Sequence, residues 1–161
     1  MSKFTLELAV KTAIRAEALS IVFFNRIAER LTSMPDIKMA ITELSIRDSE
    51  HKYIFEYLLH KAPQIAINAE KDDIDFLSTV DVRKYFDELE SPNDMKKPSE
   101  IIKFAYEFKK DTVLFYIALR ELFGTEPSLD SIIKREKTQM NTLMQILLTD
   151  LRLKGIYDIW E

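Results

Sequence analysis

Glycine is almost absent from this chain, and its scarcity limits the folds that the chain can adopt. Only Gly124 and Gly155 occur among the 161 residues. Tight β-hairpins and phosphate-binding loops draw on glycine because they need positive φ angles or close backbone approach, whereas α-helices do not. The chain has 161 residues, and 47% of them are hydrophobic. It is therefore long enough and apolar enough to build one core. These features predict an all-α fold.

Four long stretches place apolar residues at spacings of three and four, which is the pattern of an amphipathic helix. Short links join the first stretch to the second and the third to the fourth, so we expect two antiparallel helix pairs in a four-helix bundle. The predicted helices span about 5–31, 36–62, 98–123 and 127–153.

The segment between the two helix pairs, 63–97, is long enough to cross the length of a bundle. It carries one shorter amphipathic piece, which predicts a short helix near 80–89. The sequence therefore predicts one bundle domain over 1–154. A C-terminal tail over 155–161 follows, and its apolar residues are expected to dock on the bundle or on a partner.

Charge and composition argue against several classes of function. The net charge is -4, and no basic block stands out that would bind nucleic acid. No apolar run is long enough to span a bilayer, so we expect a cytoplasmic protein without a membrane partner. The absence of cysteine removes disulfides, thiolate metal sites and iron–sulfur clusters, and leaves carboxylate and imidazole as the available metal ligands.

Polar residues interrupt the apolar face of each predicted helix near its middle. An acid and a histidine three residues apart on a helix lie on the same side, about one turn apart, so both can reach one cation. This joint placement predicts a metal site or the remnant of one. The interrupting residues are Glu17 on the first helix, Asp48 and His51 on the second, Lys109 on the third, and Glu136 and Gln139 on the fourth.

The two halves of the chain repeat this polar pattern faintly. An aromatic pair follows the polar residue of the first helix and that of the third at the same distance, and the second and fourth helices each carry an acid followed by a nitrogen-bearing side chain one turn later. The matched positions are Glu17 with Lys109, Asp48 with Glu136, and His51 with Gln139.

The pattern resembles the ferritin-like superfamily, and within it the rubrerythrin-type di-iron domain. The resemblance covers the four helices, the long crossover and the acid-x-x-His turn of the second helix. It implies metal ligands at Glu17, Asp48, His51 and Glu136. Two positions depart from the family, because Lys109 stands in place of a glutamate and Gln139 in place of a histidine. The resemblance places both departures on the same metal.

The family reduces oxygen or peroxide at two irons, so the resemblance implies related chemistry at a degenerate site. Three carboxylates against one ammonium leave a formal charge of -2, which one divalent cation would neutralise. We therefore expect at most one divalent metal, iron or another ion. If active, the chain would be an oxidoreductase that needs an external electron-transfer protein, because it lacks the cysteine-ligated iron module of full rubrerythrins.

Two other interpretations stay open at this stage. In one, no metal binds, Lys109 pairs with Glu17 or Glu136, and the chain is a helical scaffold that acts by protein interaction. In the other, Glu107 or Asp111 replaces Lys109 as a ligand through a local helix shift. A homodimer, formed through an outer helix face or the tail, is expected for the scaffold.

Two local expectations concern the chemistry of the site. Without a metal, burial is expected to raise the pKa values of the acids, because it disfavours their charged forms. Tyr116 follows Lys109 on the same predicted helix, and its hydroxyl could donate a hydrogen bond to a site carboxylate.

Overall fold

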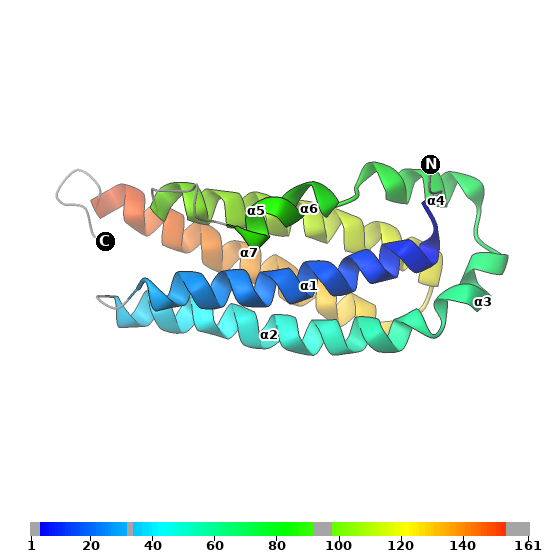
Figure 1. Ribbon diagram of the computed structural model, residues 1–161, viewed down its shortest axis with the longest axis horizontal. Helices are drawn as coiled ribbons and strands as arrows, with labels where there is room; N and C mark the ends of the chain where they lie inside the picture. Colours follow the sequence, from blue (N-terminus) through cyan, green and yellow to red (C-terminus); the bar gives the residue numbers. More distant parts are fainter. Residues whose placement is uncertain (1–3, 32–33, 92–97, 154–161) are drawn as a thin grey trace.

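A computed structural model of the chain describes residues 4–31, 34–91 and 98–153. This part of the chain is helical and contains no β-strand, which confirms the all-α class. Four long helices lie side by side along the length of the molecule (Figure 1). They are α1 (Leu6–Glu29), α2 (Pro35–Leu59), α6 (Pro98–Phe123) and α7 (Pro127–Leu153).

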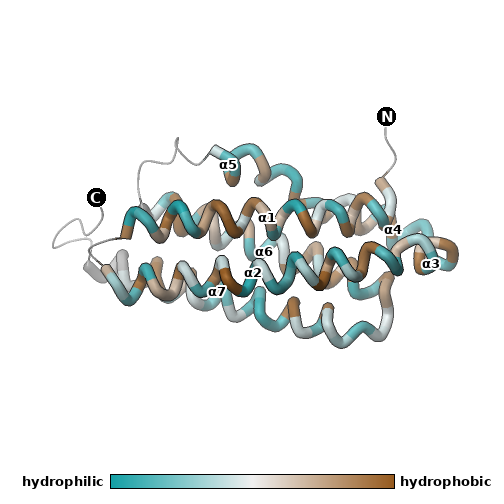
Figure 2. Tube along the Cα trace, turned by 60° about the horizontal axis from the view of Figure 1, so that its bottom comes forward, coloured by the Kyte–Doolittle hydropathy of each residue, from teal (hydrophilic) through white to brown (hydrophobic). Residues whose placement is uncertain are grey.

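The long helices pack in two pairs. α1 lies along α2, and α6 lies along α7, with the members of each pair running in opposite directions in Figure 1. Contacts between α2 and α7 join the pairs. Hydrophobic and hydrophilic segments alternate along each long helix in Figure 2, which is how an amphipathic helix turns one face to a core and the other to water.

Aromatic side chains fill much of the core. The rings of Phe55 and Tyr116, from different helix pairs, have centroids 4.7 Å apart. Phe23 and Phe24 pack edge to face on α1. Burying a side chain of this size contributes about 1.5 to 3 kcal/mol, so these rings are a large part of what holds the two pairs together.

Proline and glycine mark several helix ends. Pro35, Pro98 and Pro127 begin α2, α6 and α7, where proline costs no hydrogen bond because the first N–H groups of a helix have no partner within it. Gly124 follows α6 with a φ of 70°, a left-handed conformation that suits glycine. These residues are why both bounds of α6 and the start of α7 coincide with the ranges predicted from the sequence.

The first two helices end earlier than predicted. α1 ends at Glu29 rather than at 31, and α2 ends at Leu59 rather than at 62. Pro63 explains the second difference, because it has no N–H to donate to the Leu59 carbonyl four residues before it. Pro63 instead lies in the first turn of a new helix, α3 (Ala62–Ile67).

The crossover contains more helix than predicted. After α3 come α4 (Lys71–Thr79), a 3-10 turn η1 (Arg83–Tyr85) and α5 (Phe86–Glu90), in place of the single short helix predicted near 80–89. The Asp81 side chain accepts the backbone N–H of Arg83 at 3.1 Å, which favours a local turn over a continuous helix. α3 and α4 each bury one side chain, too few to produce a recognisable helical period in the sequence.

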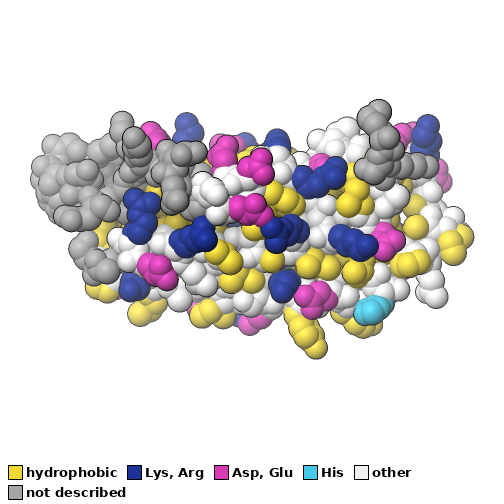
Figure 3. All heavy atoms as spheres, in the orientation of Figure 1, with side chains coloured by type: hydrophobic (Ala, Val, Ile, Leu, Met, Phe, Trp, Pro, Cys, Tyr) yellow, Lys and Arg dark blue, Asp and Glu magenta, His cyan; other side chains and the backbone are white. Residues whose placement is uncertain are grey.

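The exterior is mixed in charge on the face shown in Figure 3, where Lys and Arg lie beside Asp and Glu with hydrophobic side chains between them. Among the described helices, none combines the length and the apolar character needed to cross a membrane. The tail predicted over 155–161 lies outside the described residues.

Candidate metal centre

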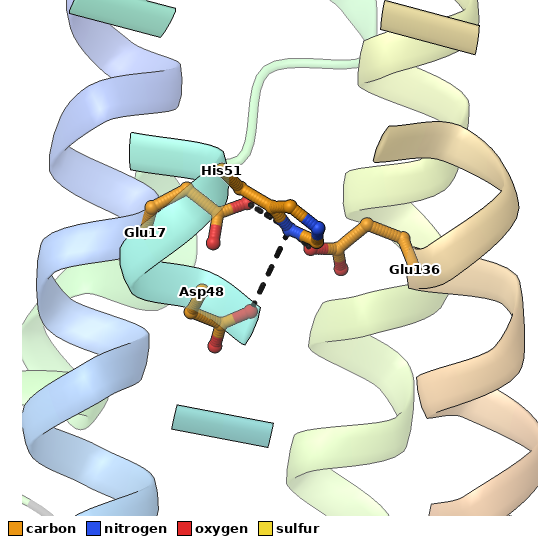
Figure 4. Close-up of side chains that lie close together, drawn as sticks. All are labelled: Glu17, Asp48, His51 and Glu136. Atoms are coloured by element: carbon orange, nitrogen blue, oxygen red, sulfur yellow. Dashed lines mark hydrogen bonds and ion pairs between the residues drawn. The ribbon is translucent and has the colours of Figure 1, made fainter. Parts of the chain in front are cut away.

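Four buried ionisable side chains converge between the long helices (Figure 4). Each offers one ligand atom, and these atoms all lie within 4.8 Å of one another. The residues are at most 1% exposed. They are Glu17 from α1, Asp48 and His51 from α2, and Glu136 from α7. Carboxylate oxygen and imidazole nitrogen are common ligands of divalent transition metals, so the cluster could hold a metal ion.

The polar residues reach the core because they keep the period of the apolar face. Each long helix carries two buried polar residues three positions apart. A buried apolar or aromatic residue lies four positions before the first of them, and another lies four positions after the second. The four sets are Ala13-Glu17-Ser20-Phe24, Leu44-Asp48-His51-Phe55, Ala105-Lys109-Thr112-Tyr116 and Ile132-Glu136-Gln139-Leu143. The faint repeat between the halves of the chain therefore extends to all four helices.

Lys109 points into the cluster from α6 instead of reaching out to solvent. Its Nζ donates to Asp48 Oδ1 at 2.9 Å and lies 3.0 Å from Glu136 Oε2. The rings of Phe24 and Phe108 lie 5.5 Å and 5.8 Å from the same nitrogen. α6 thus supplies a cation in an apolar setting, where an ammonium needs carboxylate partners.

Two neutral side chains complete the surroundings of Asp48. Gln139 on α7, which is 3% exposed, donates through Nε2 to Asp48 Oδ1 at 3.2 Å. Ser20 on α1 donates to Asp48 Oδ2 at 2.5 Å. With Lys109, the carboxyl group accepts three hydrogen bonds, one from each of the other three long helices. Ser20 was not predicted as a site residue, although its position three residues after Glu17 could have signalled it.

Tyr116 donates its hydroxyl to Glu17 Oε1 at 2.7 Å, as the sequence suggested. Burial, followed by the nearby Glu17 carboxyl, raises the pKa of Tyr116 well above its usual range. The phenol therefore keeps its proton and acts as a fixed donor that orients Glu17.

Glu107 and Asp111 lie away from the cluster. Glu107 pairs with Lys110 at 2.8 Å, and Asp111 accepts the Tyr85 hydroxyl and pairs with Lys84 at 3.2 Å. Neither acid contacts the cluster, so the structure does not place either of them where Lys109 stands.

His51 and Glu136 form an ion pair inside the cluster. His51 Nδ1 lies 3.0 Å from Glu136 Oε1 and 3.6 Å from Glu17 Oε1. Burial alone lowers the pKa of His51, but the two carboxyl groups raise it to about 10 overall. Burial raises the pKa of Glu136, yet Lys109 and His51 bring it down to about 2. The histidine is therefore protonated and Glu136 is ionised near neutral pH.

Glu17 has the opposite character. Burial is the largest effect on it, and together with the charges of Glu136 and Asp48 it raises the pKa well above the usual range, against a smaller lowering by Lys109. The expectation of raised pKa values is thus right for Glu17 and wrong for Glu136, because both cations of the cluster contact Glu136. Two cations, Lys109 and protonated His51, thus lie among the three carboxyl groups of the cluster.

Several buried polar atoms of the cluster have no hydrogen-bond partner among the residues that the structure describes. They are Glu17 Oε2, His51 Nε2, Gln139 Oε1 and Glu136 Oε2, the last of which has an ion pair with Lys109 Nζ at 3.0 Å. Buried polar atoms are seldom left unpaired in proteins, because desolvation without a partner is costly. The free carboxyl oxygen of Glu17, beside a histidine and two further carboxyl groups, fits a donor set for a divalent cation.

No protein-family model, curated protein or solved structure matches this chain.

Proposed function

We propose that the chain is a ferritin-like protein of the rubrerythrin type, in the non-haem di-iron carboxylate class, whose site retains one divalent metal position. The convergence of three carboxyl groups and one imidazole from three long helices carries this proposal. Such ligands suit iron or manganese in a buried site. Four long helices with a long connection in the middle of the chain are also consistent with that superfamily.

In this proposal Lys109 takes the place of the second metal ion. The resemblance assigns Asp48 and Glu136 as the carboxylates that bridge the two metals, and these are the two that the Lys109 ammonium contacts. An ammonium is a compact cation with three donors, so it can neutralise bridging carboxylates. Gln139, in the other altered position, supports Asp48 with a hydrogen bond.

The chain's own residues would hold the ion and keep water from it. Glu17 and His51 would be its terminal ligands, and Asp48 and Glu136 would be shared with Lys109. Tyr116 would fix the orientation of Glu17 from outside the ligand set. A bound iron would supply electron transfer to oxygen or peroxide, and a separate electron-transfer protein would restore the electrons, since the chain has no cysteine for an iron module of its own.

A metal-free helical scaffold is the second candidate, and the charge balance of the cluster favours it. The Lys109 ammonium contacts both Asp48 and Glu136, protonated His51 contacts Glu136, and burial raises the pKa of Glu17 well above its usual range. A network of this kind holds the four helices together without any ion. The protein would then act through a partner, such as a second copy of the chain.

We expect protein purified without chelator to carry about one iron or manganese ion per chain. His51→Ala should lower the affinity by at least about a hundredfold, because it removes the imidazole ligand. Elemental analysis, together with calorimetric titration of Mn²⁺ and of Fe²⁺ without oxygen, measures both. His60→Ala is the matched control, since His60 is exposed and should leave binding unchanged. An absence of bound metal and of any titration signal would favour the scaffold.

The double substitution Lys109→Glu and Gln139→His should raise the content to about two ions per chain, because it restores a carboxylate and an imidazole at the two altered positions. Elemental analysis after iron loading gives the count. The control is Lys110→Glu with Gln145→His, which makes the same chemical change on exposed positions of the same two helices. An equal count in both double variants would contradict the proposed ligand positions.

A further inference from the structure

A groove on the surface of the bundle leads toward the buried cluster. It lies between α2 and α7 and has a volume of about 520 Å³. Its lining includes Leu44, Arg47, Arg135 and Gln139. Three other surface cavities, around Phe4, around Thr79 and around Tyr53, share no lining residue with the cluster.

Gln139 belongs both to this groove and to the contacts of Asp48. Its Nε2 donates inward to Asp48 Oδ1 at 3.2 Å and to the Leu44 carbonyl at 3.5 Å. One side chain therefore stands between the groove and a carboxylate of the cluster. Both of its hydrogen bonds are long for N–H···O bonds, and its Oε1 has no partner among the described residues, so the amide is weakly held.

The two arginines of the groove have carboxylate partners. Arg47 Nε pairs with Glu43 at 3.1 Å, and Arg135 pairs with Glu50 at 2.7 Å. Arg47 therefore pairs along α2, whereas Arg135 reaches from α7 across to α2. Among the residues that line the groove, Gln139 is the one that donates a hydrogen bond to a cluster carboxylate.

We infer that Gln139 is the gate between the groove and the buried cluster. Small molecules reach Asp48 and its neighbours along α2 and α7 when the Gln139 amide turns away from the Asp48 carboxylate. The inference rests on the groove and on the contacts of Gln139, and it stands whether or not the cluster binds a metal.

A single introduced thiol tests the gate. The chain has no cysteine, so Ser20→Cys creates its sole thiol. Ser20 is fully buried and contacts the other oxygen of Asp48 at 2.5 Å, which places it behind Gln139 as approached from the groove. The rate of its modification by methyl methanethiosulfonate, followed by mass spectrometry under native conditions, reports entry to the cluster.

Adding Gln139→Ala to the Ser20→Cys variant should raise the modification rate by about tenfold or more. The substitution removes the amide that lies between the groove and Asp48, together with its two hydrogen bonds. Gln139→Ser, a smaller change that keeps a polar group, should give an intermediate rate. Adding Thr142→Trp to Gln139→Ala should return the rate toward that of Ser20→Cys alone, because Thr142 lines the groove and a large ring there blocks the path.

Ser45→Ala is the control for general loosening. It removes a partly buried hydrogen bond of 2.8 Å from Ser45 on α2 to Asn25 on α1, and Ser45 does not line the groove. An equal rise of the modification rate in the Ser45→Ala variant would overturn the gate. So would a modification rate that does not change with Gln139→Ala, or one that Thr142→Trp does not lower again. The readout needs no metal, so a failure here is separate from a failure of the proposed function.

Discussion

Replacing Lys109 with methionine should destabilise the metal-free protein by about 3 to 5 kcal/mol. Methionine keeps much of the volume and apolar length of the side chain but removes the ammonium that contacts Asp48 and Glu136. Two fully buried carboxylates are then left with protonated His51 as their remaining cation. The expected fall in melting temperature is roughly 6 to 20 °C for a chain of this size.

Thermal and urea unfolding of metal-free protein measure this loss. Lys110→Met is the matched control, because Lys110 is exposed and its pair with Glu107 is solvent-screened, so the cost should be below about 1 kcal/mol. If Lys109→Met is as stable as the control, the buried ammonium does not hold the cluster together. Saturating Mn²⁺ should restore part of the lost stability if the site binds metal, because a ligand that binds only the folded state stabilises it.

The affinity for a divalent metal should rise steeply with pH. A metal ion requires an imidazole nitrogen without its proton and an ionised carboxylate. In the metal-free chain His51 keeps its proton up to a pKa of about 10, and the pKa of Glu17 is raised well above its usual range. Each proton that must leave weakens binding about tenfold per pH unit below the pKa of its group.

His51 alone should therefore strengthen binding by about tenfold per unit between pH 6 and 9, and Glu17 should bring the slope to about a hundredfold where it too is protonated. Glu136 adds no slope in this range, because its pKa of about 2 keeps it ionised throughout. Calorimetric titration with Mn²⁺ in buffers of different ionisation enthalpy gives both the affinity and the number of protons released. His60→Ala should keep the slope, and an affinity independent of pH would contradict the assignment of His51 and Glu17 as ligands.

The sequence predicted the fold best where residue chemistry marks an element's end. Pro98, Gly124 and Pro127 delimit the last two helices, and the predicted ranges coincide with α6 and α7. The crossover was harder to predict, because short helices such as α4 bury one side chain and depend on what they pack against. The predicted end of the second helix at 62 is too late, because Pro63 lies in the first turn of α3 and cannot donate the backbone hydrogen bond that would continue α2.

Helical spacing was enough to place the six polar residues of the site in one layer of the core. It could not give their charge states, because these depend on distances between side chains of different helices. The low pKa of Glu136 and the high pKa of His51 arise from their mutual contact and from Lys109, which only the packed structure defines. The inward direction of Lys109 is likewise set by its carboxylate partners across the core.

All four long helices meet at one carboxyl group. Asp48 belongs to α2 and accepts hydrogen bonds from Ser20 on α1, Lys109 on α6 and Gln139 on α7. Apolar side chains repeat along each helix, so sliding a helix by one turn, about 5.4 Å, would preserve many hydrophobic contacts. The same slide would pull its donor away from Asp48 and leave a buried polar group or charge unpaired, at a cost of a few kcal/mol. A single aspartate thereby sets the axial alignment of the four helices, a task that leucine and phenylalanine cannot perform because they pack almost equally well at neighbouring positions.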